Sequence, residues 1–301
     1  MRLRVATYNI HKGVLRDLFG LRRVASIHEL RARLHQIEAD LILLQEVQGE
    51  HKRHAGRFEH WPAEPQDQFL ARSPGLRQSF ESAYGQNATY LHGHHGNALL
   101  SRFPILHRSH RDFSDHALEK RGVLHCVIDL SGQPVHCFVV HFGLLARSRE
   151  RQLDALIDWI CHEVTSDLPL IIGGDFNDWR NRLSRRMCDA LGVVEAFDAC
   201  RSGFDEPEQP PRFIRERLAH LGVQAERDGL PLPRRVRSAR TFPALVPWLR
   251  MDRIYVRGFS VENARVPRGA AWARLSDHSP VIADLTLEPR TESSLTVAVD
   301  G

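Results

Sequence analysis

The feature that most constrains the fold is a series of short, mainly apolar segments, each of which runs directly into polar residues. The three clearest are Leu41–Leu44 before Gln45-Glu46, segment 135–140 before His141, and segment 170–172 before Gly173-Gly174-Asp175. Apolar runs of this length are typical of strands that are buried on both faces. The chain is therefore expected to form buried sheets that carry polar side chains at the strand ends.

Helices are expected between these strands. Ser26 and Glu29 have the spacing of a capping box, and apolar residues follow at helical intervals up to Ile37. A second helix is expected over 153–164. Further strands are expected at 99–100, 122–130, 253–256 and 281–287, in addition to a first strand that ends at Asn9. Many strands with few helices favour an α/β fold in which sheets pack on each other and helices lie outside.

The length of 301 residues and the 42% hydrophobic content allow one large domain. We expect this domain over 1–287, with a Pro- and Arg-rich insertion over about 203–240 that holds a helix near 212–221, and a loosely ordered tail over 288–301. The chain shows no secretion signal, no transmembrane segment and no C-x-x-C pair among its five cysteines. A monomeric, cytoplasmic protein is expected.

The net charge of +4 and the pI near 9 would suit a polyanionic partner. Nearly all of the positive charge is arginine, since lysine occurs only at positions 12, 52 and 120. Such a bias can equally reflect the codon composition of the source genome. Nucleic acid is therefore a possible partner that the charge alone does not require.

Residues with hard oxygen atoms dominate the expected strand ends. They are Asn9, Glu46, Asp175, Asn177 and Asp277. Mg²⁺ and Mn²⁺ prefer carboxylate and amide oxygens to thiolate. Hydrolysis of a phosphodiester needs a cation at the phosphoryl oxygens, a base that orients water, and donors for the charge of the transition state. These residue types therefore point to metal-assisted phosphoester hydrolysis.

The sharpest local signal is the segment Ser276-Asp277-His278-Ser279-Pro280. A carboxylate next to a histidine, just before a strand, can reach a metal and a phosphate from one turn. An acidic partner would fix the tautomer of His278 or keep it protonated, and we expect Asp252 to be that partner.

The chain resembles the endonuclease/exonuclease/phosphatase superfamily, whose fold is the DNase I-like fold. The matching motifs occur in family order and are Thr7-Tyr8-Asn9-Ile10, Leu44-Gln45-Glu46-Val47, Gly96-Asn97-Ala98-Leu99-Leu100-Ser101-Arg102, Val140-His141-Phe142, Gly174-Asp175-Phe176-Asn177, Met251-Asp252-Arg253-Ile254 and Ser276-Asp277-His278-Ser279-Pro280. The resemblance covers nearly the whole chain. It implies a four-layered α/β sandwich, with two packed mixed β-sheets flanked by helices and an active site at one edge.

The resemblance also implies roles for individual residues. Glu46 is the expected principal metal ligand, with Asn9 and Asp277 beside it. Asp175 and Asn177 are expected to orient the attacking water and hold the phosphate. His278, supported by Asp252, is expected to contact the phosphate, and His141 is expected on the leaving-group side. The chain departs from many nucleases of the family at His11, where they carry Asn or Asp as an indirect support for the metal.

Several residues have two readings. Arg102 and Arg121 are candidates for substrate binding, but both also fit ordinary structural arginines. His92, His94 and His95 could suggest zinc, but they lack Cys or a helical i, i+4 pair, so a loop at the rim of the site is preferred.

The first functional hypothesis is hydrolysis of a phosphodiester or phosphomonoester in a small molecule or lipid, with Mg²⁺ or Mn²⁺ as cofactor. The second is a Mg²⁺-dependent DNA endonuclease or exonuclease, for which the aromatic content is modest at 8%. A third, a binding module without catalysis, is disfavoured because no expected site position is replaced by an apolar residue.

Overall fold

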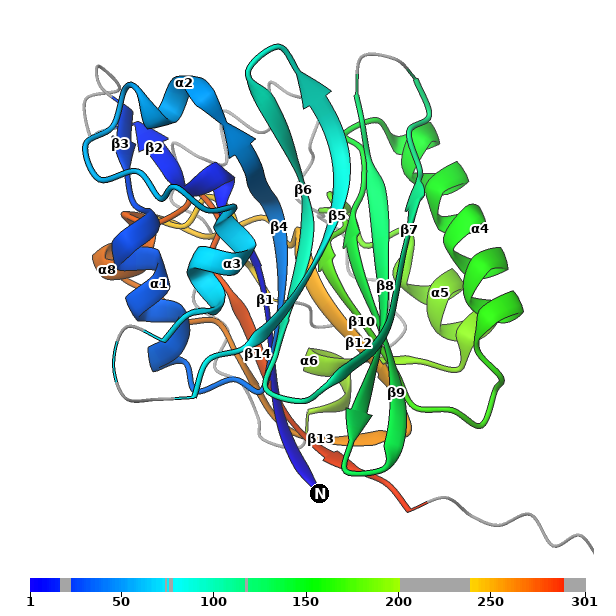
Figure 1. The fold of residues 1–301 in the computed structure, drawn as a ribbon. Helices are drawn as coiled ribbons and strands as arrows, with labels where there is room; N and C mark the ends of the chain where they lie inside the picture. The colour runs from blue at the N-terminus through cyan, green and yellow to red at the C-terminus, as the bar shows by residue number, and fades with distance from the viewer. Residues whose placement is uncertain (17–22, 74, 76–77, 117–118, 201–238, 290–301) are drawn as a thin grey trace, which may run out of the picture.

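Two six-stranded sheets pack face to face, and helices cover their outer faces, in the computed structural model of the chain (Figure 1). The structure describes residues 1–16, 23–73, 75, 78–116, 119–200 and 239–289. The expected four-layered α/β sandwich is confirmed. Most of the segment 203–240, including the helix expected near 212–221, and nearly all of the tail lie outside the described residues, so those two predictions stay predictions.

The first sheet has the strand order β13-β14-β1-β4-β6-β5. Its strands are β1 (Arg2–Asn9), β4 (Leu41–His51), β5 (Glu81–Tyr90), β6 (Gly93–Ser101), β13 (Phe259–Arg265) and β14 (Val281–Leu287). Strands β1 and β4 run parallel, so their carboxyl ends lie at the same edge. The other neighbours in this sheet are antiparallel.

The second sheet has the order β11-β12-β10-β9-β8-β7. Its strands are β7 (Ile105–Asp112), β8 (Gly122–Leu130), β9 (Gln133–His141), β10 (Leu170–Asp175), β11 (Val194–Glu195) and β12 (Asp252–Arg257). Strands β9 and β10 form the parallel pair here, and the other neighbours are antiparallel. A separate hairpin pairs β2 (Val14–Arg16) with β3 (Arg23–Ala25).

Most of the helices lie outside the sheets. They are α1 (Ile27–Gln36), α2 (Lys52–Ala55), α3 (Gln66–Ala71), α4 (Ala146–Glu163), α5 (Ser184–Leu191), α6 (Ala196–Ala199) and α8 (Ala270–Ala273), with one 3-10 turn, η1 (His11–Gly13). The long helices α1 and α4 connect the parallel pairs β1/β4 and β9/β10, as parallel strands require. Figure 1 shows α1 and α4 on opposite sides of the sandwich.

Alternating side chains of the strands fill three buried apolar clusters. Leu3, Val5 and Leu43 point between the sheets, where they meet Ile171 and Ile254 of the second sheet. The intervening residues point outward: Ala6, Tyr8 and Ile42 pack against α1 and α3, while Phe138, Val140 and Ile172 pack against α4. This two-residue period is the one that a strand buried on both faces produces.

The local prediction at Ser26 is right in position and wrong in mechanism. The helix begins at Ile27, yet the Ser26 side chain makes no capping bond. Its hydroxyl donates instead to the carbonyl oxygen of Leu275 over 3.0 Å, because the loop before β14 packs against the start of α1.

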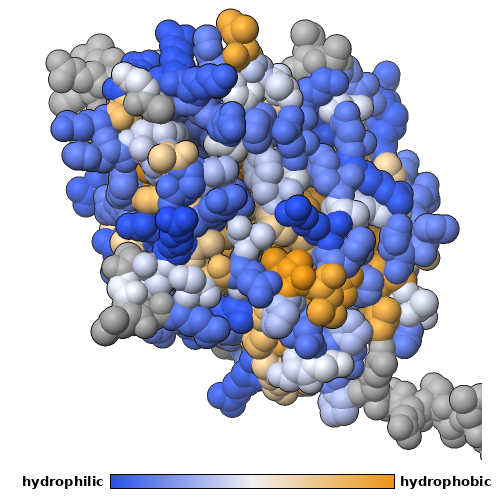
Figure 2. All heavy atoms as spheres, viewed as in Figure 1, coloured by the Kyte–Doolittle hydropathy of each residue, from blue (hydrophilic) through white to orange (hydrophobic). Residues whose placement is uncertain are grey.

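The face seen in Figure 1 is mainly hydrophilic, with apolar side chains gathered chiefly in one small area (Figure 2). Among the described residues, no helix is both long and apolar enough to cross a membrane.

Candidate active site

The candidate site lies at the edge where the parallel pairs of the two sheets end. In the first sheet Asn9 lies beside Gln45, and in the second sheet His141 lies beside Asp175. Asp252, the first residue of β12, is the antiparallel partner of Asp175. A hydrogen bond of 3.2 Å from Asn9 Nδ2 to Asp175 Oδ2 joins the two sheets. Each sheet therefore supplies part of one site.

Glu46 reaches this edge through a β-bulge. Strand β4 is predicted to end at Gln45-Glu46, but it continues to His51, so that prediction is wrong. The pairing of β4 with β6 slips between Leu44 and Val47, and Glu46 has a φ of +56°. A bulge leaves an extra residue unpaired and redirects its side chain. As a result, Glu46 Oε1 lies 3.3 Å from Asn9 Nδ2, which donates to it.

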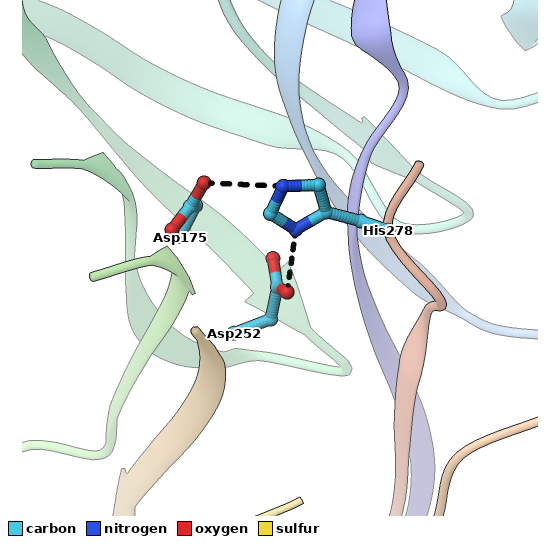
Figure 3. A group of neighbouring side chains, drawn as sticks. All are labelled: Asp175, Asp252 and His278. Carbon is cyan, nitrogen blue, oxygen red and sulfur yellow. Dashed lines mark hydrogen bonds and ion pairs between the residues drawn. The ribbon is translucent and has the colours of Figure 1, made fainter. Parts of the chain in front are cut away.

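His278 lies between two buried carboxylates (Figure 3). Its Nδ1 donates to Asp252 Oδ2 over 2.8 Å, and its Nε2 lies 3.8 Å from Asp175 Oδ2. Burial alone would lower the pKa of His278, but the charges of Asp252 and Asp175 outweigh it and raise the pKa to about 10. His278 is therefore a cation of fixed orientation at neutral pH. The structure thus places Asp252 next to His278, as the sequence suggested.

Two hydroxyl groups that sequence reasoning did not assign to the site complete this arrangement. Thr241 Oγ1 donates to Asp252 Oδ2 over 2.5 Å. Ser276 Oγ donates to the carbonyl oxygen of Asn9 over 2.6 Å and accepts from the backbone N–H of His278 at 3.2 Å. Ser276 could have been found from its place beside Asp277-His278, whereas Thr241 carries no local signal.

Asp175 and Asn177 form a tight turn after β10. Asp175 Oδ1 accepts from the backbone N–H of Asn177 at 2.9 Å, and Asn177 Nδ2 donates to the carbonyl oxygen of Phe142 at 2.9 Å. Burial raises the pKa of Asp175 to about 6, against the charge of His278, which lowers it. Asp175 can therefore hold or release a proton near neutral pH.

His141 is almost fully buried at the end of β9, and its Nε2 lies 3.7 Å from Asp175 Oδ2. Burial and the charge of Arg121 hold its pKa well below the usual value for histidine, despite the opposing charge of Glu46. His141 is therefore a neutral imidazole, in contrast to His278.

Asn9, Glu46 and Asp277 lie together where the first sheet meets the site, and two basic side chains lie against Glu46 and Asp277. Lys12 Nζ is 3.1 Å from Glu46 Oε2, and His11 Nδ1 is 3.2 Å from Asp277 Oδ1. Burial raises the pKa of Glu46, but the nearby positive charge, chiefly that of Lys12, outweighs it, so the pKa is lowered. Burial likewise opposes the hydrogen bond from His11 at Asp277, whose pKa is lowered overall. Both carboxylates are thus ionised.

This donor set fits a hard divalent cation, because it consists of two ionised carboxylates and one amide, whose oxygen atoms are the ligands that Mg²⁺ and Mn²⁺ prefer. Asp175, Asp252 and His278 form a second group whose ligand atoms lie within 4.8 Å of one another. His278 already contacts both carboxylates of that group, so the histidine supplies positive charge between them. Asn9, Glu46 and Asp277 then remain the candidate ligands, and we call these three residues the metal-binding set.

The structure does not bring the two candidate arginines to the site in the same way. Arg102 lies at the opposite end of the first sheet, where its Nε donates to the carbonyl oxygen of Ala39 and its guanidinium stacks on Phe80. Arg121 lies near the site, but its Nε donates to the carbonyl oxygen of Phe142 and its terminal nitrogen to Glu119. The contacts of Arg102 are therefore those of a structural arginine. Arg121 stabilises the segment after His141.

The histidine-rich segment is a β-hairpin rather than a loop, because β6 begins at Gly93. His94 Nδ1 forms a hydrogen bond of 2.9 Å with the hydroxyl of Tyr84, away from the metal-binding set. His95 is coupled electrostatically to Lys12 and Glu46, and burial lowers its pKa to about 4. Within the described parts of the chain, His92, His94 and His95 do not gather into a metal-binding group.

Asn97 has a structural role that its place in a sequence motif does not reveal. This buried residue of β6 donates from Nδ2 to the carbonyl oxygens of Gly122 and Val139, at 2.8 and 3.0 Å. Both acceptors belong to the second sheet, so one amide ties the two sheets together beside the site.

Comparison with known proteins is consistent with this geometry. A model of the endonuclease/exonuclease/phosphatase family matches residues 6–278. The chain is 36% identical over 286 residues to the uncharacterized protein YbhP of Escherichia coli (strain K12), and the match covers 94% of this chain and 96% of that protein.

Two solved structures share the fold at low sequence identity. A mannosyl-6-phosphatase of Bacteroides thetaiotaomicron has a TM-score of 0.61 at 16% identity, covering 95% of this chain and 100% of that one. The D. rerio protein TDP2, in complex with a single-strand DNA product, has a TM-score of 0.57 at 15% identity, covering 95% and 99%. At such identities the likeness concerns the fold alone.

Proposed function

Because this chain belongs to the endonuclease/exonuclease/phosphatase family, we propose that it is a divalent-metal-dependent phosphoesterase. The observation that carries the proposal is the buried array Asp252–His278–Asp175 next to three hard oxygen donors at one strand edge. A protonated histidine held between carboxylates is costly to bury. It is useful where negative charge builds up, as it does on a phosphoryl group under attack.

Each catalytic residue has its own role in the proposed reaction. Asp175 accepts the proton of the attacking water, which Asn177 helps to orient, because the pKa of Asp175 near 6 suits a general base. His278 donates to a phosphoryl oxygen, and Asp252 keeps it charged and aligned. His141, as a neutral imidazole, donates to an oxygen on the leaving-group side.

Asn9, Glu46 and Asp277 would hold the divalent cation. Mg²⁺ or Mn²⁺ bound there would supply positive charge to the phosphoryl oxygens.

The depth of the site favours a small or projecting substrate. Asp175, His141, Asn177 and His278 are each at most 5% exposed, so only a slender group reaches them. A phosphate at the end of a small molecule or a lipid headgroup meets this condition better than the backbone of a DNA duplex. We therefore place hydrolysis of a small-molecule or lipid phosphoester first.

The test is Mg²⁺- and Mn²⁺-dependent hydrolysis of bis-p-nitrophenyl phosphate, with EDTA as the metal-free condition. Glu46→Ala and Asp175→Asn are expected to lower kcat by at least about 100-fold, because each removes a group that acts on the transition state. The thermal unfolding midpoint of each variant controls for folding. Full activity in EDTA, or in either variant, would contradict the mechanism.

A substrate panel then separates small phosphoesters from nucleic acid. It contains sugar phosphates, phospholipid vesicles, plasmid DNA, abasic duplex and RNA, each with both metals. We expect turnover of the small or lipid substrates, and a preference for DNA would establish the nuclease alternative instead.

A further inference from the structure

The turn that follows β1 has a backbone conformation that residues with side chains rarely adopt. His11, Lys12 and Gly13 have φ values of +45°, +62° and +64° in succession. Only Gly13 takes this conformation freely, because it has no Cβ. Strain of this kind persists where the surrounding structure fixes it, and it is concentrated at functional sites.

The surrounding contacts fix this turn firmly. The buried side chain of Gln66 donates from Nε2 to the carbonyl oxygen of Lys12 at 2.8 Å and accepts at Oε1 from the backbone N–H of Gln48 at 2.8 Å. The carbonyl oxygen of Gly13 accepts from the backbone N–H of Ser26 at 2.9 Å. One side chain thus ties the turn to β4, the strand that carries Glu46.

Because of this fixed turn, the ammonium group of Lys12 lies beside the metal-binding set. Lys12 Nζ lies 3.1 Å from Glu46 Oε2, and the Lys12 side chain is 37% exposed, so its ammonium has room to move toward solvent. A divalent cation on Glu46 would repel that ammonium strongly at such a distance. The two cations therefore compete for one carboxylate.

The residue type suits a contact that must be released. All but three of the 41 basic residues Lys and Arg are arginine, and yet lysine stands here. An arginine would grip the carboxylate with two parallel hydrogen bonds, whereas the ammonium is a point charge on a flexible stem.

We propose that Lys12 is an exchangeable counter-ion, which binds Glu46 in the metal-free protein and moves to a phosphoryl oxygen of the substrate when the divalent cation takes that carboxylate. The inference rests on the proposed function, because it assigns Glu46 to the metal. Once Glu46 is taken, a phosphoryl group at the same edge is an anion within reach of the Lys12 stem. Lys12 thus neutralises Glu46 when no metal is bound, and it contacts the phosphate when the metal is bound.

The test measures binding rather than turnover. Mn²⁺ is titrated by calorimetry into the EDTA-stripped full chain at pH 8, and inorganic phosphate is then titrated into the Mg²⁺-saturated chain. The variants are Lys12→Met, which keeps the length of the side chain, and Lys12→Gly, which accepts the positive φ without strain. Lys52→Met, an exposed lysine of α2, is the matched control.

Both Lys12 variants are expected to bind Mn²⁺ about tenfold more tightly and phosphate about tenfold more weakly than the unchanged chain, since one unit charge is removed from beside each ligand. Lys52→Met is expected to change neither. Unchanged Mn²⁺ affinity, or unchanged phosphate affinity, in the Lys12 variants would overturn the exchange. If the unchanged chain bound no Mn²⁺ at all, the proposed function would fail together with the exchange, so the two failures are distinguishable.

Discussion

At the scale of single residues, the charge of each site group depends on a partner that local sequence does not name. Asp252 is fully buried, and within the described part of the chain its Oδ1 has no hydrogen-bond partner. Its other oxygen accepts hydrogen bonds from both His278 and Thr241. The carboxylate is therefore committed to holding His278 in its charged form.

Asp252→Asn is expected to lower kcat by about 100-fold or more, because His278 loses the charge that keeps it protonated and aligned. Thr241→Val should lower kcat by only about tenfold, because it removes one hydrogen bond and leaves the charge. Steady-state kinetics on bis-p-nitrophenyl phosphate measure both effects, with KM reported separately. An Asp252→Asn enzyme with unchanged kcat would show that His278 does not need this partner.

Residues next to the apolar strands were predictable, whereas those fixed by tertiary contacts were not. His141 and Asp175 directly follow buried strands, so their place at the edge follows from the pattern. Lys12 reaches Glu46 only through three successive residues with positive φ, which no sequence period encodes. Arg102 follows a strand as well, but that strand runs in the opposite direction, so it ends at the other edge of the sheet.

At the scale of elements, the strands buried on both faces were found and the edge strands were not. β8, β10 and β14 match the expected segments, since burial makes them almost continuously apolar or alternating. β5 and β7, at the edges of their sheets, consist largely of polar residues, because one side of each faces solvent. The bulge in β4 was also missed, because an apolar run does not reveal where pairing slips.

The antiparallel pair β8/β9 contains a buried imidazole pair that makes stability depend on pH. His125 Nε2 and His136 Nδ1 lie 3.0 Å apart, and the His125 ring stacks on Phe138. Burial, with the nearby charge of His136, lowers the pKa of His125 to about 3. The folded pKa lies below the unfolded value, so the stability that neutral His125 contributes is present above about pH 6.5 and is lost as pH falls toward 3.

His125→Gln is therefore expected to reduce the acid sensitivity of the fold. Between pH 7 and 4.5 the unchanged chain should lose on the order of 2 kcal/mol more unfolding free energy than the variant. Urea unfolding at the two pH values gives this difference, and His162→Gln, an exposed histidine of α4, serves as the control. Equal losses in His125→Gln and the unchanged chain would mean that His125 does not titrate in the fold.

At the scale of the whole molecule, the four-layered fold was predictable because motifs over the full length recur in a family order. The contacts between the sheets were not predictable, since they join residues that are far apart in sequence. The clearest of these is Asn97, whose amide bonds two carbonyl oxygens of the opposite sheet.

Asn97→Ala should lower the free energy of unfolding by about 2–3 kcal/mol, because it removes two buried hydrogen bonds between the sheets. Asn87→Ala, which removes half-buried hydrogen bonds to Asn97 and His110, should cost less than about 1 kcal/mol. Urea unfolding measures both changes. If Asn97→Ala lost no more unfolding free energy than Asn87→Ala, the Asn97 amide would not hold the sheets together.

Strand β14 pairs with β1, so strands from opposite ends of the described residues lie side by side. His278 and Asp277 immediately precede β14, and Asp252 begins a strand in the other sheet. A nascent chain therefore contains the site residues from Asn9 to Asn177 before Asp252, Asp277 and His278 are made. A chain that ends before Asp252 lacks three of the eight candidate site residues, so we expect it to have no phosphoesterase activity.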